Sequence, residues 1–320
     1  MKKLIMNILL LSGVLLTSCS DDGDVKIVSL NTFGNKVCMN DRVKVFVSAE
    51  TSGDEVPTYE WGCSEGSMTN PQGLFENVWQ APKKPGEYEI WVTVKCGGSK
   101  ETRRAKMTVL DELFYSDFET PYYNEGYSNS SMTLAQDSKT GSLKLTSSKD
   151  KGVFQRNWND ETIVPPYSMQ MQYNPQTFKD GNSIDFRIAF SSLSEGTKDL
   201  RNINFSIEPS TGNTYIYSQY FNKETGDIES LETSATVIND LKFTKSWKYV
   251  SVSIDASNNF IVYLNGVKIV ESTFLKTFFP QSSYPIKGSG VALSNKAVVL
   301  VDDMSVIING EICNATERVR

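Results

Sequence analysis

One segment of the sequence carries aromatic and amide side chains in the alternation of a β-strand. Every second side chain of an extended strand falls on the same face. Within residues 213–221 this rule groups Tyr215, Tyr217, Gln219 and Phe221. Flat rings stack on the C–H faces of sugars, and neighbouring amides bind sugar hydroxyls. The segment therefore predicts a glycan-binding surface, and the alternative, that this face packs in the core, stays open.

Trp158 is the second aromatic candidate for sugar stacking. It lies in the polar stretch 155–160, Gln-Arg-Asn-Trp-Asn-Asp, which favours a loop over a buried strand. A tryptophan left unburied in a loop offers the widest flat surface to a ligand. The sequence therefore predicts Trp158 as the first platform, with Tyr215 and Tyr217 next.

The composition excludes several kinds of chemistry. The chain has 320 residues, a net charge of −6 and no histidine. The lack of histidine removes Ser-His-Asp triads, imidazole zinc sites and histidine bases. No long basic cluster is present, so nucleic acid is not an expected partner. The cysteines form no CxxC pair, so a zinc ribbon is not expected. Catalysis would therefore depend on carboxylates, tyrosine, lysine or arginine.

The N-terminus predicts export. Two lysines precede the apolar run 4–16, which is shorter than the roughly 20 residues of a membrane-spanning helix. The run fits the hydrophobic part of a signal peptide over residues 1–18. Leu-Thr-Ser-Cys at 16–19 resembles the lipobox of bacterial lipoproteins, which implies lipidation of Cys19. An ordinary secretory signal with a chance cysteine is the alternative.

The acidic segment 19–24 follows, Cys-Ser-Asp-Asp-Gly-Asp. It resembles the export tag behind the lipidated cysteine of Bacteroidota-type surface lipoproteins, although a plain solvated tether has the same composition. The resemblance implies an outer-membrane protein, held by its lipid anchor and facing the cell exterior.

The rest of the chain alternates apolar and polar residues between closely spaced turns, which predicts an all-β protein. Residues 25–110 form the first unit. Its segments YEW, VWQAP and PGEYEIWVTV resemble PKD and related Ig-like domains of bacterial surface proteins. The resemblance implies a β-sandwich that serves as a spacer, with Trp61 in its core.

The same resemblance places the cysteines of the first unit. In an Ig-like sandwich Cys38 and Cys63 would lie at one end and Cys96 at the other. An exported protein can form disulfides. The resemblance therefore implies a Cys38–Cys63 bridge.

Residues 111–310 form the second unit, and residues 311–320 a C-terminal tail. A strand from Trp247 to Asp255, a hairpin and Tyr-Leu-Asn-Gly-Val-Lys at 263–268 resemble the concanavalin A-like, LamG-type family. The segments SDFE and VDDMSV, near the two ends of the unit, recur in such domains. The resemblance implies a jelly-roll sandwich and leaves the ligand open, because this fold carries lectins, glycan-binding modules, hydrolases and lyases.

The resemblance also suggests a metal site. First and last strands usually pair in this fold, which would bring Asp117 and Glu119 towards Asp302 or Asp303. Clustered carboxylates suit Ca²⁺, and related domains often carry a structural calcium. Separate, solvated acids are the alternative.

Enzymes of this family carry features that the chain lacks. Its glycosidases place two acids as E-x-D-x-x-E on one strand, and its lyases usually use histidine with tyrosine. The nearest stretch here, 183–187, carries the single acid Asp185. The sequence therefore predicts a non-catalytic polysaccharide-binding protein at the cell surface, with uptake or adhesion proteins as partners. The alternatives are a protein-binding or adhesion module and, behind it, a carboxylate-based glycosidase or lyase.

Overall fold

The computed structural model describes residues 24–52, 55–118, 126–158, 163–242, 244–280, 284–294 and 296–308. These ranges contain 25 strands, one 3₁₀ turn, η1 (Asn239–Leu241), and one short helix, α2 (Phe274–Phe278). The predicted all-β class, an Ig-like sandwich followed by a concanavalin A-like jelly roll, is confirmed. No helix within these ranges is long and apolar enough to cross a membrane. The predicted signal peptide, Cys19, Glu119 and the tail 311–320 lie outside the described residues.

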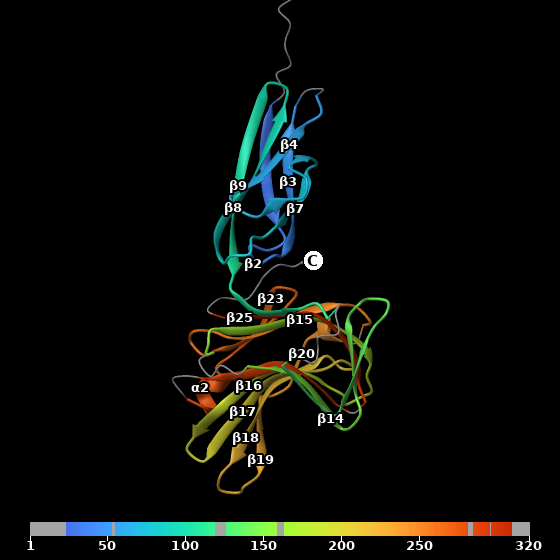
Figure 1. Ribbon diagram of the computed structural model, residues 1–320, viewed down its shortest axis with the longest axis vertical. Helices are drawn as coiled ribbons and strands as arrows, with labels where there is room; N and C mark the ends of the chain where they lie inside the picture. The colour runs from blue at the N-terminus through green and yellow to red at the C-terminus, as the bar shows by residue number, and fades with distance from the viewer. Residues whose placement is uncertain are drawn as a thin grey trace, which may run out of the picture.

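The first unit is a sandwich of two sheets (Figure 1). One sheet has the order β1 (Val25–Thr32), β3 (Arg42–Thr51), β7 (Glu76–Gln80) and β5 (Ser67–Met68). The other has the order β2 (Lys36–Cys38), β9 (Ser99–Leu110), β8 (Gly86–Cys96), β4 (Thr58–Cys63) and β6 (Gln72–Gly73). Trp61 and Trp79 are buried between the sheets, so the predicted core position of Trp61 is confirmed.

The predicted Cys38–Cys63 disulfide is wrong: Cys38, Cys63 and Cys96 form no disulfide with one another. Cys38 pairs with Leu110 on β9, whereas Cys63 pairs with Ile90, which faces Ala105 of β9. The offset of five positions is roughly 17 Å along the strands, and three strand spacings add roughly 14 Å across the sheet. A disulfide needs Cα atoms within about 7 Å. Cys38 and Cys63 lie on β2 and β4, which are separated by β9 and β8 in the same sheet. The sequence prediction considered only the end of the sandwich at which each cysteine lies and did not specify this separation across the sheet.

The second unit consists of two sheets of eight strands each, which we call the proximal and the distal sheet. The proximal sheet has the order β12 (Met132–Gln136), β13 (Leu143–Ser147), β25 (Val298–Ile308), β15 (Tyr167–Thr177), β21 (Lys248–Ile254), β22 (Phe260–Leu264) and β23 (Val267–Ser272), with β10 (Glu112–Ser116) on β25. The distal sheet has the order β11 (Tyr127–Ser130), β14 (Lys151–Asn157), β24 (Ile286–Ser294), β16 (Ile184–Glu195), β17 (Lys198–Glu208), β18 (Asn213–Asn222) and β19 (Ile228–Glu232), with β20 (Thr236–Val237) on β18.

Alternation along the strands builds the core between these sheets. On β17 the side chains of Ile203, Phe205 and Ile207 enter the core, and on β21 those of Val250 and Val252 belong to the same core. Full burial of one such side chain stabilises the fold by about 1.5–3 kcal/mol. The core therefore fixes which face of each strand remains for a ligand.

Two sequence signals recur in the observed topology. Asn265 and Gly266 join β22 to β23 with φ of 49° and 79°, as a tight hairpin turn requires. The first strand of the second unit, β10, pairs with its last, β25, and Ser116 lies opposite Met304. The predicted Asn-Gly turn and the predicted pairing of first and last strands are both confirmed.

The first unit rests on the outer face of the proximal sheet (Figure 1). Ile307 of β25 is fully buried and packs in the hydrophobic core of the first unit. Gln170 of β15 donates from Nε2 to Cys38 Sγ at 3.7 Å and accepts a hydrogen bond from Ser251 Oγ at 3.3 Å. Because the proximal sheet lies between the first unit and the distal sheet, the outer face of the distal sheet points away from the first unit.

Candidate functional site

The predicted aromatic segment is β18, and its alternation is confirmed. Ile216 and Tyr220 pack in the core between the sheets. Tyr215, Tyr217 and Gln219 therefore lie on the outer face of the distal sheet, which we call the polar face. This settles the alternative left open by the sequence, because the face that packs in the core is the opposite one.

Two glycines curve the sheet towards the polar face. Gly290 of β24 lies opposite Arg187 of β16, so a side chain at Gly290 would point to the same side as Arg187. A Cβ atom at Gly290 would overlap the Phe154 oxygen of β14, and one at Gly288 would overlap the Arg156 oxygen. The backbone of β14 thus bends over this side of β24, and the polar face is concave along that edge.

Asp185 of β16 is the centre of a polar cluster on this face. Only 2% of the residue is exposed. Its Oδ1 accepts a hydrogen bond from Ser206 Oγ at 2.7 Å, and its Oδ2 accepts one from the Tyr217 hydroxyl at 2.6 Å. Lys151 Nζ of β14 lies 2.8 Å from Oδ2. Strands β14, β16, β17 and β18 therefore each contribute one side chain to the cluster.

The cluster removes Tyr217 as a stacking platform, which corrects the sequence prediction. Lys151 Nζ lies 5.0 Å from the centroid of the Tyr217 ring and donates to its hydroxyl at 2.5 Å. Burial, followed by the charge of Asp185, raises the pKa of Tyr217 far above its usual value. The hydroxyl therefore remains a donor to Asp185, and the lysine occupies the space beside the ring.

A row of amides continues the polar face along β17 and β18. Asn204 Nδ2 donates to Asn202 Oδ1 at 2.5 Å, and Asn202 Nδ2 donates to Gln219 Oε1 at 3.2 Å. Asn202 and Asn204 are each only 1% exposed, whereas Gln219 is partly exposed. The two asparagines therefore fix the orientation of the one amide in the row that can reach a ligand.

Tyr215 is a partly exposed aromatic residue on the polar face, as is Phe221, the last residue of the predicted group. Its ring centroid lies 5.8 Å from that of Tyr217, with the ring planes inclined by 38°. Burial raises the pKa of Tyr215, so its hydroxyl is neutral at physiological pH. The neighbouring ring of Tyr217 holds the Tyr215 ring in place, and the exposed part of the Tyr215 ring can contact a sugar.

The structure corrects the prediction for Trp158. The residue directly follows β14, and its indole packs against the core between the sheets. Its Nε1 donates to the Tyr167 hydroxyl at 3.1 Å, which in turn donates to Ser289 Oγ at 2.9 Å. The Arg156 guanidinium lies 5.4 Å from the ring. Alternation along β14 turns Phe154, Arg156 and Trp158 to the inner side, so Trp158 is no platform on the polar face.

The predicted calcium ligands are only partly within the described residues. Asp303 Oδ1 accepts a hydrogen bond from the Tyr115 hydroxyl at 2.6 Å, and Oδ2 accepts one from Gln172 Nε2 at 2.7 Å. Within the described ranges no three acidic, cysteine or histidine side chains form a group that could hold a metal ion. Glu119 lies outside these ranges, so the calcium site with Asp117 and Asp303 stays a prediction.

The sequence analysis missed most of the polar cluster. Asn202, Asn204 and Ser206 alternate with three core side chains in the segment Asn-Ile-Asn-Phe-Ser-Ile. This alternation was a readable signal of an outward polar row. The roles of Lys151 and Arg187 could not be read in this way, because they depend on which strands become neighbours.

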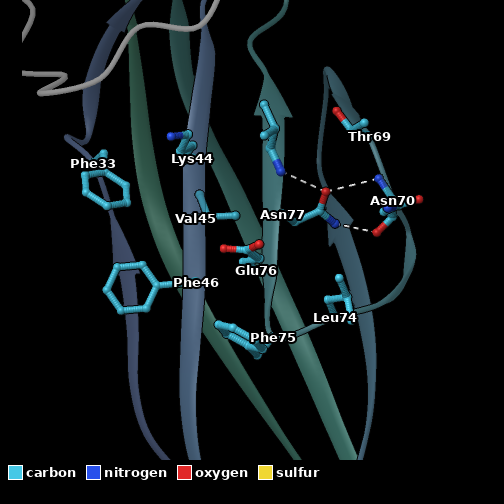
Figure 2. A pocket seen from close by; sticks show the side chains of 11 residues that line it. Phe33, Lys44, Val45, Phe46, Thr69, Asn70, Leu74, Phe75, Glu76 and Asn77 are labelled. Atoms are coloured by element: carbon cyan, nitrogen blue, oxygen red, sulfur yellow. Dashed lines mark hydrogen bonds between the residues drawn. The ribbon is translucent and has the colours of Figure 1, made fainter.

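A pocket of 460 Å³ lies on the first unit, between β3, β7 and the segment 69–75 (Figure 2). Asn77 shapes it, since its Oδ1 accepts hydrogen bonds from the backbone of Asn70 at 3.0 Å and of Val78 at 2.8 Å. Leu74 and Phe75 form an exposed apolar rim. Nothing in the sequence patterns marked this pocket.

Comparisons with known proteins give fold likenesses alone. No family model and no curated protein matches the chain. A Bacteroides ovatus glycoside hydrolase family 16 endo-glucanase is 11% identical, covers 61% of this chain and 100% of its own, and has a TM-score of 0.46. The carbohydrate recognition domain of Emp47p is 12% identical over 63% of this chain and 95% of its own, with a TM-score of 0.42.

A Bacillus subtilis protein of unknown function with a galectin-like fold is 11% identical, covers 62% of this chain and 96% of its own, and has a TM-score of 0.39. These neighbours include a hydrolase and a recognition domain, so they do not decide between catalysis and binding. Because the TM-scores are below 0.5, the assignment of the fold rests on the sheets described above.

Proposed function

We propose that the polar face binds a polysaccharide or oligosaccharide without cleaving it. One observation carries the proposal: a buried and internally hydrogen-bonded polar layer lies on the open side of a curved sheet, away from the core. Fixed donors and acceptors beneath a partly exposed ring suit sugar recognition, because little side-chain freedom is lost on binding. Tyr215 supplies the ring and Gln219 the oriented amide.

The arrangement of Asp185 favours binding over hydrolysis. Glycosidases place two carboxyl groups about 5–10 Å apart across the bond that they cleave. Among the described outward residues of β14, β16 and β24, Asp185 is the sole acid, and the acid at the end of β17, Glu208, accepts hydrogen bonds from Thr211 and Asn213 at 3.1 Å each. Its oxygens are occupied by Ser206, Tyr217 and Lys151, and Tyr217 holds its proton too firmly to act as a base.

The proposal predicts that Tyr215→Ala weakens binding and leaves folding intact. Loss of a stacking ring costs about 1 kcal/mol or more, which is at least about five-fold in affinity. Affinity electrophoresis against a glycan panel measures the effect, together with a thermal melt. A core aromatic would instead lose about 3–5 kcal/mol of stability. Unchanged retardation of the Tyr215→Ala variant would exclude Tyr215 from the site.

A second candidate function, protein binding, is favoured by the pocket of the first unit. Leu74 and Phe75 are 59% and 53% exposed at its rim, and such exposed apolar groups suit a side chain of a partner protein. Phe75→Ser is therefore the matched control for Tyr215→Ala. If the Phe75→Ser variant loses retardation and the Tyr215→Ala variant keeps the retardation of the wild type, the binding site lies on the first unit and not on the polar face.

We also propose that the protein is anchored by lipid at Cys19 and faces the cell exterior. Val25, the first residue of β1, pairs with Thr51 of β3. The backbone oxygen of the neighbouring Ser52 accepts a hydrogen bond from Cys96 Sγ. These residues therefore mark the end of the first unit that lies opposite the end with Leu110. The anchored end and the polar face would then lie at opposite ends of the molecule (Figure 1). This orientation suits capture of a ligand away from the membrane.

Lipidation is tested by metabolic labelling with a radioactive fatty acid. The wild type and a Cys63→Ala control are expected to incorporate label, and the Cys19→Ala variant is expected to incorporate none. Acylation provides the anchor, so that variant should also leave the membrane fraction. Equal labelling of all three proteins would contradict the lipobox interpretation.

A further inference from the structure

Arg187 is the unexplained cation of the polar face. It lies on β16, two positions after Asp185, and therefore points to the same side of the sheet. Its cross-strand neighbours are Asn204 of β17 and Gly290 of β24, neither of which carries a charge. The side chain is partly exposed, so a ligand in solution can reach part of it.

The guanidinium forms no ion pair within the part of the chain that the structure describes. Its Nε is buried and has no hydrogen-bond partner among the described residues. The ion pairs of the described chain do not include Arg187. Buried charged groups are normally paired, because desolvation without a partner is costly. An arginine without an ion pair beside a proposed ligand site therefore calls for a partner that the described residues do not supply.

The nearby charges leave this part of the face positive. Asp185 is paired with Lys151, and Tyr217 is neutral, so the charges of Lys151 and Asp185 offset each other and the charge of Arg187 remains. Burial lowers the pKa of Arg187, and the nearby Asp185 partly counteracts this. An arginine side chain keeps its proton at neutral pH. Two further acids lie on this face: Glu232 of β19 is in the same cross-strand row as Arg187 but three strands away, and Glu208 of β17 lies four positions beyond Asn204.

We propose that the ligand of the polar face is an acidic glycan, and that Arg187 binds its carboxylate or sulfate group. This inference rests on the proposed function and adds the class of sugar to it. A planar guanidinium donates two parallel hydrogen bonds to such an anion, which a lysine cannot match. Tyr215 would stack on the sugar ring, while Arg187 would select the charged substituent.

The test uses pairs of oligosaccharides that differ only in one acidic group. One pair compares a hexuronate chain with its methyl ester, and another compares a sulfated chain with its unsulfated form. The wild type is expected to bind the acidic member of at least one pair about ten-fold more tightly or better, a typical effect of a charge-assisted hydrogen bond. Which pair shows the preference identifies the acidic group.

Arg187→Met removes the charge and keeps most of the length. It is expected to bind both members of a pair alike, and its melting temperature should not fall, since an unpaired buried charge is removed. Arg187→Lys should retain part of the preference, because it keeps the charge without the planar fork. Arg103→Met, at an exposed position of β9, is the matched control and should behave as the wild type.

The outcomes separate this inference from the proposed function. Equal binding of acidic and neutral members by the wild type, or a preference that survives in Arg187→Met, overturns the role of Arg187 and leaves glycan binding standing. No binding of either member overturns both. If Arg187→Met does not fold, salt decides: raising NaCl from about 0.05 M to about 0.5 M must weaken acidic binding in the wild type and leave neutral binding unchanged. Salt-independent preference overturns the inference.

Discussion

Replacing Asp185 with leucine is expected to lower the free energy of unfolding by about 3 kcal/mol. The change leaves the hydroxyls of Tyr217 and Ser206 without their acceptor, and each buried unsatisfied group costs about 1–3 kcal/mol. Lys151 loses its counter-ion as well, although its side chain is 39% exposed and water compensates part of that loss. Denaturant titration measures the effect.

Two further variants identify its cause. Asp150 is exposed, so Asp150→Leu should change stability by no more than about 0.5 kcal/mol. Adding Lys151→Met to Asp185→Leu removes the unpaired cation and should restore part of the loss. If the single Asp185→Leu variant is as stable as the wild type, the cluster does not hold the polar face together.

Replacing Gly290 with valine is expected to cost about 3 kcal/mol of stability and to abolish ligand binding. A Cβ atom at this position would overlap the oxygen of Phe154 and the Cα atom of Gln155. Both belong to the backbone of β14, which cannot move aside as a flexible side chain could, so the strain is at the upper end of that seen in overpacked sites. β14 also carries Lys151, so its displacement would separate Lys151 from Asp185.

Lys287→Ala is the control for this variant on the same strand. Lys287 is exposed, and its truncation should change stability by no more than about 0.5 kcal/mol. A Gly290→Val variant with the melting temperature and ligand affinity of the wild type would show that the curvature of β14 over β24 is not needed.

The alternation of β18 could be read from the sequence because it depends only on local geometry. Ile216 and Tyr220 face the core and Tyr215 and Gln219 face outward, whatever strands lie beside them. The Asn-Gly turn at 265–266 was readable for the same reason, since few residues adopt positive φ at two successive positions.

The failed predictions depended on neighbours that the sequence does not name. The polar stretch around Trp158 suggested a loop, yet Trp158 directly follows β14, which pairs with both β11 and β24, and the polar Gln155 and Asn157 lie on the outer side of that strand. The disulfide prediction placed Cys38 and Cys63 at one end of a sandwich without fixing their strands. Arg187 likewise has uncharged cross-strand neighbours because β16 pairs with β17 and β24, which place Asn204 and Gly290 opposite it.

The central claim, binding without cleavage at the polar face, is tested most directly on the wild-type protein without its predicted signal peptide. A polysaccharide panel is assayed twice, by affinity electrophoresis and for newly released reducing ends or unsaturated products. The account predicts retardation on at least one polysaccharide and no product from any of them. Product release from a polysaccharide would contradict non-catalytic binding, and the absence of retardation on every one would contradict glycan binding itself.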